Sequence, residues 1–162
     1  GSTTPYAASN FFSAAASTRV YCLRASSVST TGTAYNTGGL FMGDGGQYVA
    51  DFVTTGADRY FTYNWDGNAD YANAAAALSV FVIVSVQHIS GNVRIRINRG
   101  SWATTASGNT TNLSNYLSFA FLNGGTGSSL DMQNAAFFNT ALGNADLEGV
   151  EDYFASVAGI TL

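Results

Sequence analysis

The clearest pattern of apolar and polar positions runs from Leu78 to Asn98 and predicts a long β-hairpin. Its first half is a nearly continuous run of β-branched and aromatic residues: Val80, Phe81, Val82, Ile83, Val84 and Val86. A strand with such residues at successive positions is expected to be covered on both faces. Ser90-Gly91-Asn92 supplies a tight turn, because Gly and Asn tolerate positive φ.

The return strand of this hairpin alternates strictly between apolar and charged residues. Val93, Ile95 and Ile97 share one face, and Arg94 and Arg96 share the other. A period of two indicates a half-exposed strand. We therefore expect the arginine face to be open to water or to a ligand.

Short strands separated by Gly, Asp and Asn turns are predicted on both sides of the hairpin. They are residues 18–26, 39–43, 47–54, 59–65, 116–122 and 130–139. The intervening polar segments at 27–39, 66–77, 100–115 and 123–129 are predicted loops, and residues 3–17 a short strand or a docking arm. This meander of short strands is typical of an all-β protein.

One helix is predicted, from Asn144 to Val157. Apolar residues recur at helical spacing at Leu147, Val150, Phe154 and Val157, with Tyr153 beside them. Asn144 is the candidate N-cap, and Gly159 is placed to close the C-terminus.

Length and composition indicate one domain over residues 3–162. The 162 residues are 46% hydrophobic and 10% charged, lack lysine and carry a net charge of −4. That balance argues against a nucleic-acid partner, which would need a dense basic patch.

The lone Cys22 excludes an internal disulfide and is expected to be buried. The sequence contains no apolar run of 18 or more residues, so membrane insertion is not predicted. Gly1-Ser2 is typical of a cloning remnant, so we expect other domains of a parent protein upstream.

The C-terminal third resembles the closing segment of bacterial and phage laminin-G-like domains, which belong to the concanavalin A-like lectin/glucanase superfamily. The matching residues are Phe138-Asn139, Ala141-Leu142, Asp146, Leu147, Tyr153, Gly159 and Ile160. The hairpin VIVSVQHISGNVRIRINRG is similar to the valine-rich hairpin of that family, although Arg99 interrupts the family's Asn-Gly. The resemblance covers residues 78–160 and implies a jelly roll, a β-sandwich of two antiparallel sheets with one C-terminal helix. Folds do not fix functions, and this one carries lectins, glycosidases and structural modules.

Catalysis is not expected. Glycoside hydrolysis normally needs two positioned carboxylates, and the two glutamates, Glu148 and Glu151, both fall on the predicted helix. His88 is the sole histidine, and no serine lies in a Gly-x-Ser-x-Gly motif. We therefore predict a protein that is not an enzyme.

A Ca²⁺ site is the one metal hypothesis. Asp66, Asn68 and Asp70 place oxygen side chains at positions 1, 3 and 5 of a loop, a spacing that lets a turn fold onto a hard cation. Tyr71 and Ala77 stand where an EF-hand loop has Gly and Glu. The competing interpretation is a turn rich in Asp and Asn.

Glycan binding requires an aromatic surface for the C–H face of a sugar, with planar hydrogen-bonding groups beside it. Trp65 with Asp66, Asn68 and Tyr71 is the best local cluster. Trp102, in a polar loop, is the second candidate, and the return-strand arginines Arg94 and Arg96 could line a concave face. Each has a structural alternative: Trp65 could end a core strand, and strand arginines are usually solvated.

Two functions remain open. The first is a non-catalytic module that binds carbohydrate or a cell surface, located outside the cell or on a virion. The alternative is a purely structural domain, for example a virion decoration, that contacts protein partners. A lectin predicts an exposed Trp65 or Trp102, whereas a structural domain predicts that both are packed.

Overall fold

The computed structural model describes residues 12–13, 16–27, 39–44, 47–54, 59–65, 69–75, 79–89, 91–107, 112–113, 116–120 and 129–162. Side chains are described at 16–25, 60, 62, 72–75, 79–89, 91–107 and 131–162. In this part of the chain, no helix has the length and apolar character needed to cross a membrane.

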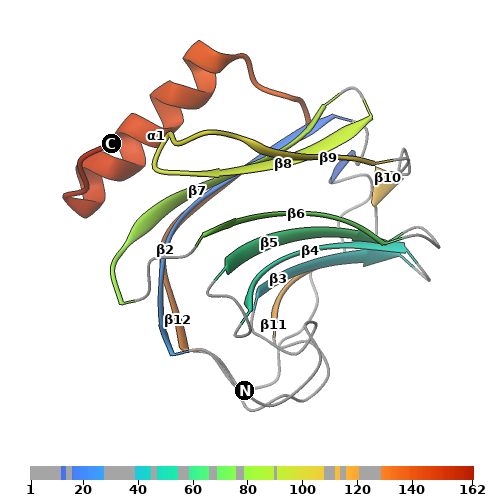
Figure 1. Ribbon diagram of the computed structural model, residues 1–162, viewed down its shortest axis with the longest axis horizontal. Helices are drawn as coiled ribbons and strands as arrows, with labels where there is room; N and C mark the ends of the chain where they lie inside the picture. The colour runs from blue at the N-terminus through green and yellow to red at the C-terminus, as the bar shows by residue number, and fades with distance from the viewer. Residues whose placement is uncertain are drawn as a thin grey trace.

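Antiparallel strands dominate the fold, and one helix follows them (Figure 1). Five strands form the helix-side sheet, in the order β12 (Ser129–Phe138), β2 (Ser17–Ser27), β7 (Val82–Ile89), β8 (Asn92–Ile97) and β9 (Ala103–Ala106). Five more form the far sheet, in the order β11 (Tyr116–Ala120), β3 (Gly39–Asp44), β4 (Gln47–Thr54), β5 (Arg59–Trp65) and β6 (Ala69–Ala75). A small ribbon pairs β1 (Phe12–Ser13) with β10 (Asn112–Leu113). The prediction of an antiparallel β protein with one C-terminal helix is confirmed.

The predicted hairpin is the centre of the helix-side sheet. β7 pairs with β8 from Val84↔Ile97 to Ile89↔Asn92, and Gly91 adopts φ +73° in the turn. β7 starts two residues later than the hydrophobic pattern suggests, because Ser79 has a left-handed backbone and Val80 lies in a bend. From Val82 to Val86 the run is buried on both faces, as its composition predicts, whereas Val80 is 51% exposed.

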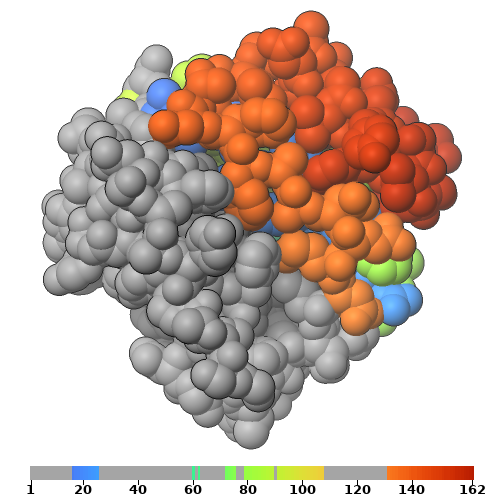
Figure 2. All heavy atoms as spheres, turned by 180° about the vertical axis from the view of Figure 1, so that it is seen from behind, coloured from blue at the N-terminus to red at the C-terminus, as the bar shows by residue number. Residues whose placement is uncertain are grey.

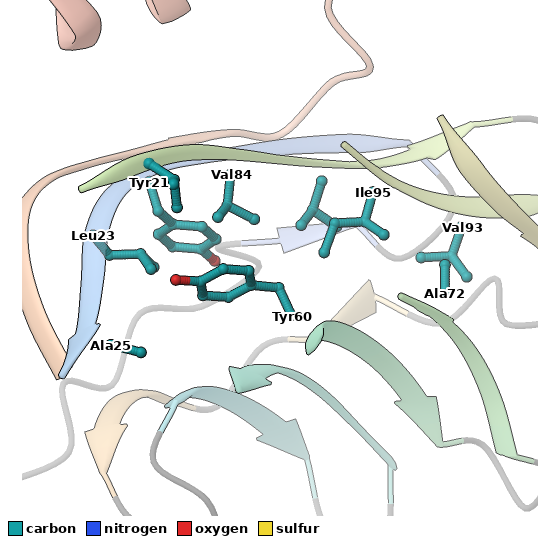
Figure 3. Packing of buried hydrophobic residues seen from close by; sticks show 10 residues of the cluster. Tyr21, Leu23, Ala25, Tyr60, Ala72, Val84, Val93 and Ile95 are labelled. Atoms are coloured by element: carbon teal, nitrogen blue, oxygen red, sulfur yellow. The ribbon is translucent and has the colours of Figure 1, made fainter. Parts of the chain in front are cut away.

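The main core fills the space between the two sheets (Figure 3). Tyr21, Leu23, Val84 and Ile95 of the helix-side sheet meet Tyr60 and Ala72 of the far sheet, as do the further core residues Ala25, Val82, Val86 and Val93. The Tyr21 ring also packs edge-on against Phe137, with the ring centroids 5.8 Å apart. These residues occupy alternate strand positions, so the other face of each sheet is left for a different purpose.

The helix α1 (Asn144–Ala158) covers the other face of the helix-side sheet. Leu147, Phe154 and Ala155 pack there against Val20, Cys22 and Ile83. Burial raises the pKa of the Cys22 thiol, as expected for a thiol that acts as a small core residue. Figure 2 shows α1 beside β12 on the rear of the molecule, so the C-terminal segment forms one continuous surface.

Three details of the predicted helix are wrong. Its N-cap is Gly143 rather than Asn144, and Val157 is 54% exposed although it was predicted to pack. Glu151 is instead fully buried at the predicted helix–sheet contact. The contact face is centred on Leu147, Glu151 and Phe154. Glu151 takes a position that is usually apolar, because hydrogen-bonding partners satisfy its charge. Gly159 ends the helix in the left-handed region, as predicted.

Three strands lie in segments that were predicted to be loops. β6 lies in residues 66–77, and β9 and β10 lie in residues 100–115. Their residues are mainly Ala, Thr, Asn and Leu, and Ala and Asn have low strand propensity. Pairing with a neighbouring strand therefore overrides local preference here. The other predicted strands are observed with small shifts at their ends.

The fully buried Leu147 should be essential for docking the helix. Leu147→Ala is expected to lower the free energy of unfolding by about 2–5 kcal/mol, the usual cost of a core cavity. Val157→Ala, at an exposed position of the same helix, should change it by less than about 0.5 kcal/mol. Urea denaturation of both variants measures the difference, and equal losses would contradict the observed helix orientation.

Tyr60 predicts a loss of stability at alkaline pH. Burial raises the pKa of its hydroxyl from 10.0 to about 12. Between these two pH values Tyr60 is ionised in the unfolded chain but not in the folded chain. The contribution of Tyr60 to the free energy of unfolding is therefore fully present below pH 10 and is lost as the pH rises to about 12. The loss should reach about 2–3 kcal/mol relative to Tyr60→Phe. Urea denaturation across this range checks it, with the exposed Tyr153→Phe as control; identical pH profiles for wild type and Tyr60→Phe would contradict the prediction.

Candidate functional site

Three of the predicted ligand-binding residues come together on the helix-covered face of the helix-side sheet. The guanidinium carbon of Arg94 lies 4.2 Å from the centroid of the Trp102 ring, and that of Arg96 lies 4.6 Å from the same centroid. Trp102 is half-buried and also packs against the apolar cluster beneath α1. Trp102, a ligand candidate because its loop is polar, therefore joins a second core that α1 brings to this face.

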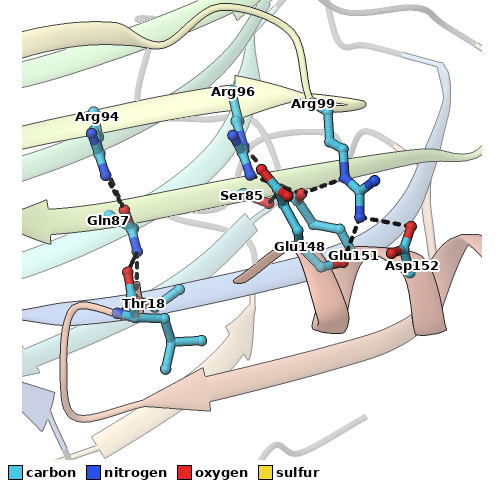
Figure 4. Close-up of polar contacts among 10 residues, drawn as sticks. Thr18, Ser85, Gln87, Arg94, Arg96, Arg99, Glu148, Glu151 and Asp152 are labelled. Carbon is cyan, nitrogen blue, oxygen red and sulfur yellow. Dashed lines mark hydrogen bonds and ion pairs between the residues drawn. The ribbon is translucent and has the colours of Figure 1, made fainter. Parts of the chain in front are cut away.

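Arg96 is held in a buried ion pair with the helix. It is 7% exposed, and its Nε and Nη2 donate to the two carboxylate oxygens of Glu151 at 2.9 and 2.8 Å (Figure 4). The Ser85 hydroxyl donates to the same carboxylate at 2.5 Å. Both of these partners of Glu151 are donors, and they satisfy a charge that would otherwise be costly to bury.

Arg99 closes this cluster at its solvent edge. Its Nε donates to Glu151 at 3.2 Å, and its Nη2 pairs with Asp152 at 2.6 Å and donates to the Glu148 carbonyl at 2.5 Å. The bond to Asp152 raises the pKa of Arg99 most, and the bond to Glu151 raises it further. Arg99 therefore links the end of the hairpin to one full turn of α1.

Arg94 extends the polar contacts toward the start of the helix. Its Nε and Nη2 donate to Gln87 Oε1 at 3.1 and 2.5 Å, and Gln87 Nε2 donates to Thr18 Oγ1 at 3.1 Å. The Thr18 hydroxyl donates to the Thr140 carbonyl and accepts from the Leu142 amide. Burial, and then the charge of Arg96, lowers the pKa of Arg94. The chain of bonds anchors the segment between β12 and α1 (Figure 4).

The half-exposed arginine face predicted from the alternating pattern is thus corrected. Arg96 is buried, and Arg94 is half-buried and bonded to Gln87. The sequence pattern did not indicate that Glu151 pairs with Arg96, because hydrophobic periodicity takes no account of charged positions. The available signal was the arginine series at 94, 96 and 99 together with a helix that carries Glu148, Glu151 and Asp152.

A second polar group lies between the two sheets. Arg19 is fully buried, with Nη2 donating to Thr62 Oγ1 at 2.9 Å and lying 3.4 Å from His88 Nε2. A guanidinium only donates, so His88 Nε2 is the acceptor in this contact. His88 is 1% exposed, so the sole histidine of the sequence is a packed residue. Within the described residues, no group of three His, Cys, Asp or Glu residues could hold a metal ion.

The remaining predicted residues belong to the edge of the far sheet. Trp65 is the last residue of β5, and Asp70 and Tyr71 are in β6, while Asp66 and Asn68 lie outside the described residues. The backbone register pairs Trp65 with Ala69, Tyr63 with Tyr71 and Asn64 with Asp70. The predicted Ca²⁺ site at Asp66, Asn68 and Asp70 therefore stays a prediction.

Strand alternation separates these positions between two faces. Tyr60 and Thr62 are buried against the helix-side sheet, so positions 60, 62 and 64 of β5 belong to the core side. Positions 61, 63 and 65 belong to the opposite side, and pairing places position 71 with them. Trp65 and Tyr71 thus share a face, whereas position 70 pairs with 64 on the core side.

Aromatic residues dominate this opposite side of the far sheet. The register pairs Tyr48 with Trp65, Phe52 with Phe61, and Tyr63 with Tyr71. It adds two more positions from β3 and β11, and we call the set the aromatic face: Phe41, Tyr48, Phe52, Phe61, Tyr63, Trp65, Tyr71 and Tyr116. The sequence signal was the alternation of aromatic residues in QYVADFVT and RYFTYNW, which single-residue searches overlooked.

Comparison with known proteins supports the fold and identifies no family. No protein-family model matches the sequence, and no curated protein matches it. Among solved structures, the chain is similar to domain 4 of AbnA, a GH43 extracellular arabinanase from Geobacillus stearothermophilus, in complex with arabinotriose. The TM-score is 0.61 at 9% identity, over 89% of this chain and 70% of that one.

Two larger proteins contain a similar unit. The binding domain of botulinum neurotoxin DC in complex with SialylT gives a TM-score of 0.55 at 12% identity, over 86% of this chain and 36% of that one. Trypanosoma rangeli sialidase in complex with the inhibitor DANA gives 0.55 at 13% identity, over 91% of this chain and 24% of that one. This chain spans well under half of either. At these identities the likeness shows a shared β-sandwich fold.

The buried ion pair predicts a large effect of a small change. Glu151→Gln removes the charge that balances Arg96 and should lower the free energy of unfolding by about 3–5 kcal/mol. Glu148→Gln, the same change on the exposed side of the helix, should cost less than about 0.5 kcal/mol. Thermal and urea denaturation compare the two, and similar costs would show that the Arg96–Glu151 pair does not hold the helix.

Proposed function

We propose that this chain is a non-catalytic carbohydrate-binding module, and that the aromatic face of the far sheet binds the sugar. The observation that carries the proposal is the strand register, which gathers Tyr48, Tyr63, Trp65 and Tyr71 on one face. Aromatic rings stack on the C–H surfaces of sugars, and the hydroxyl of Tyr and the N–H of Trp can bond to sugar hydroxyls. This face contains two of the residues predicted from sequence alone.

The helix-side sheet is less suited to this role. Arg96 is bonded to Glu151 and Arg94 to Gln87, and both guanidinium groups lie over the Trp102 ring. We assign Trp102, Arg94 and Arg96 to holding the helix rather than to a ligand. Glu151 accepts bonds from three groups, which also makes it a poor general acid or base.

The similarity to AbnA domain 4 and to the neurotoxin binding domain, solved with arabinotriose and with SialylT, supports a sugar ligand by analogy of fold. We further propose that the two sheets form a jelly roll of the concanavalin A-like type. The module would belong to a larger extracellular or virion protein and would attach that protein to a glycan or a cell surface.

A structural role is the second candidate function. Trp102 is packed, as a structural domain predicts, and Tyr153 and Val157 are 62% and 54% exposed on α1. Exposed apolar residues of this kind contribute to protein interfaces. In that case the chain would decorate a virion or contact other domains of its parent protein through α1.

A glycan array distinguishes the two functions. We expect the folded protein to bind specific glycans, and Trp65→Ala and Tyr71→Ala to weaken binding by about tenfold or more, equivalent to about 1.4 kcal/mol each. Tyr153→Ala, which removes an exposed aromatic ring from α1, is the matched control and should bind like wild type.

Running the same array with Ca²⁺ and with EDTA tests the proposed metal site at Asp66, Asn68 and Asp70. Binding that is lost in EDTA would support the site, and binding indifferent to EDTA would reject it while keeping the lectin. No binding to any glycan, with folding confirmed by circular dichroism, would favour the structural domain.

A further inference from the structure

We propose that the ligand is a neutral, extended glycan chain that lies across the strands of the far sheet. This inference rests on the proposed carbohydrate-binding function and adds the class and direction of the ligand. It is derived from the way the strand register arranges the residues of the aromatic face, from the charge of that face and from its small residues.

The register arranges the face in rows that cross all five strands. The first row, from β11 to β6, is Tyr116, Gly43, Tyr48, Trp65 and Ala69. The second row is Ser118, Phe41, Ala50, Tyr63 and Tyr71. Three of the five positions in each row are aromatic: Tyr116, Tyr48 and Trp65 in the first, and Phe41, Tyr63 and Tyr71 in the second.

The length of these rows favours a chain over a single sugar. Neighbouring strands lie about 4.8 Å apart, so a row across the sheet spans roughly 19 Å. In the second row, Phe41 and Tyr63 are two strands apart, or about 10 Å, with Ala50 between them. Only an extended ligand of several sugar units would meet Tyr116 or Phe41 at one end and Trp65 or Tyr71 at the other.

The composition of the rows favours a neutral ligand. The positions that the register places in the first two rows include no Asp, Glu, Arg or His. The third row, Ala120, Gly39, Phe52, Phe61 and Asn73, is also uncharged, and Arg59 follows only in a fourth. A carboxylated sugar would lose its hydration here without gaining a cation, which is costly.

Small residues lie between the aromatic positions. Gly43 lies between Tyr116 and Tyr48 in the first row, and Ala50 lies between Phe41 and Tyr63 in the second. Glycine and alanine leave space for close approach of a ligand backbone. In the first two rows, Tyr or Trp occupies most of the aromatic positions, and these residues combine a ring with a hydrogen-bonding group. A sugar chain, with its alternating C–H and hydroxyl surfaces, fits this combination.

The test uses the full chain and neutral oligosaccharides of increasing length. Cello-, xylo- and arabino-oligosaccharides, from disaccharide to hexasaccharide, are titrated by calorimetry, with oligogalacturonides as the anionic comparison. We expect at least one neutral series to gain about tenfold or more in affinity from disaccharide to hexasaccharide, with little dependence on salt. This length series uses wild-type protein and does not depend on the folding of any variant.

The direction of the chain is tested at the two edges of the first row. Tyr116→Ala on β11 should weaken hexasaccharide binding and leave disaccharide binding unchanged, if short ligands occupy the Trp65 end. Tyr153→Ala on α1 should change neither. A chain that runs along the strands would instead make both lengths insensitive to Tyr116→Ala, which would overturn the proposed direction.

The outcomes separate this inference from the proposed function. Equal affinity for all lengths, or salt-sensitive preference for oligogalacturonides, would reject an extended neutral ligand while a carbohydrate-binding function stands. No binding of any glycan on the array or in the titrations would reject both and would favour the structural domain.

Discussion

The buried carboxylate of Glu151 is the constraint on which the helix side of this protein depends. A charge that is fully removed from water must be matched by donors, and Arg96, Ser85 and Arg99 supply them from β8, β7 and the end of the hairpin, respectively. The geometry is met only when α1 lies across the strands in one register. Leu147 and Phe154 supply apolar contact, and the ion pair fixes where that contact forms.

The same constraint divides the two sheets between two tasks. The outer face of the helix-side sheet is covered by α1, and its polar groups are bonded to one another, from Arg94 through Gln87 to Thr18. Such a face is rigid and has few groups left to recognise a ligand. The far sheet has no corresponding helix among the described residues, and its non-core side has aromatic residues where the helix side has ion pairs. These differences are the reason why we propose the far sheet, and not the helix-side sheet, as the recognition surface.

How much of this could be predicted from sequence depended on whether the signal was local. The hairpin was predictable because Gly91 requires a turn and the β-branched run allows little but a strand. β6 was not, since ADYANAA has weak strand propensity and is ordered by pairing with β5. The packing of Trp102 was not predictable because the loop around it is polar, and the cluster it joins includes residues far away in sequence, such as Leu147 and Phe154. Glu151 was missed because its partners lie on another element.

The aromatic face was also only partly predictable, because strand pairing brings most of its residues together. Trp65 and Tyr71 were singled out because they are close in sequence, but Tyr63, Tyr48 and Tyr116 join them only through strand pairing. In β5 the alternation of Phe61, Tyr63 and Trp65 with Tyr60, Thr62 and Asn64 favours the wrong set, because the all-aromatic set is the more apolar one and yet lies away from the core. The burial of Tyr60 and Thr62 decides it. Once that face is known, the two roles that we propose are consistent with the charge distribution. Arg96, Arg99, Glu151 and Asp152 hold the helix, and the uncharged aromatic face would meet a neutral ligand.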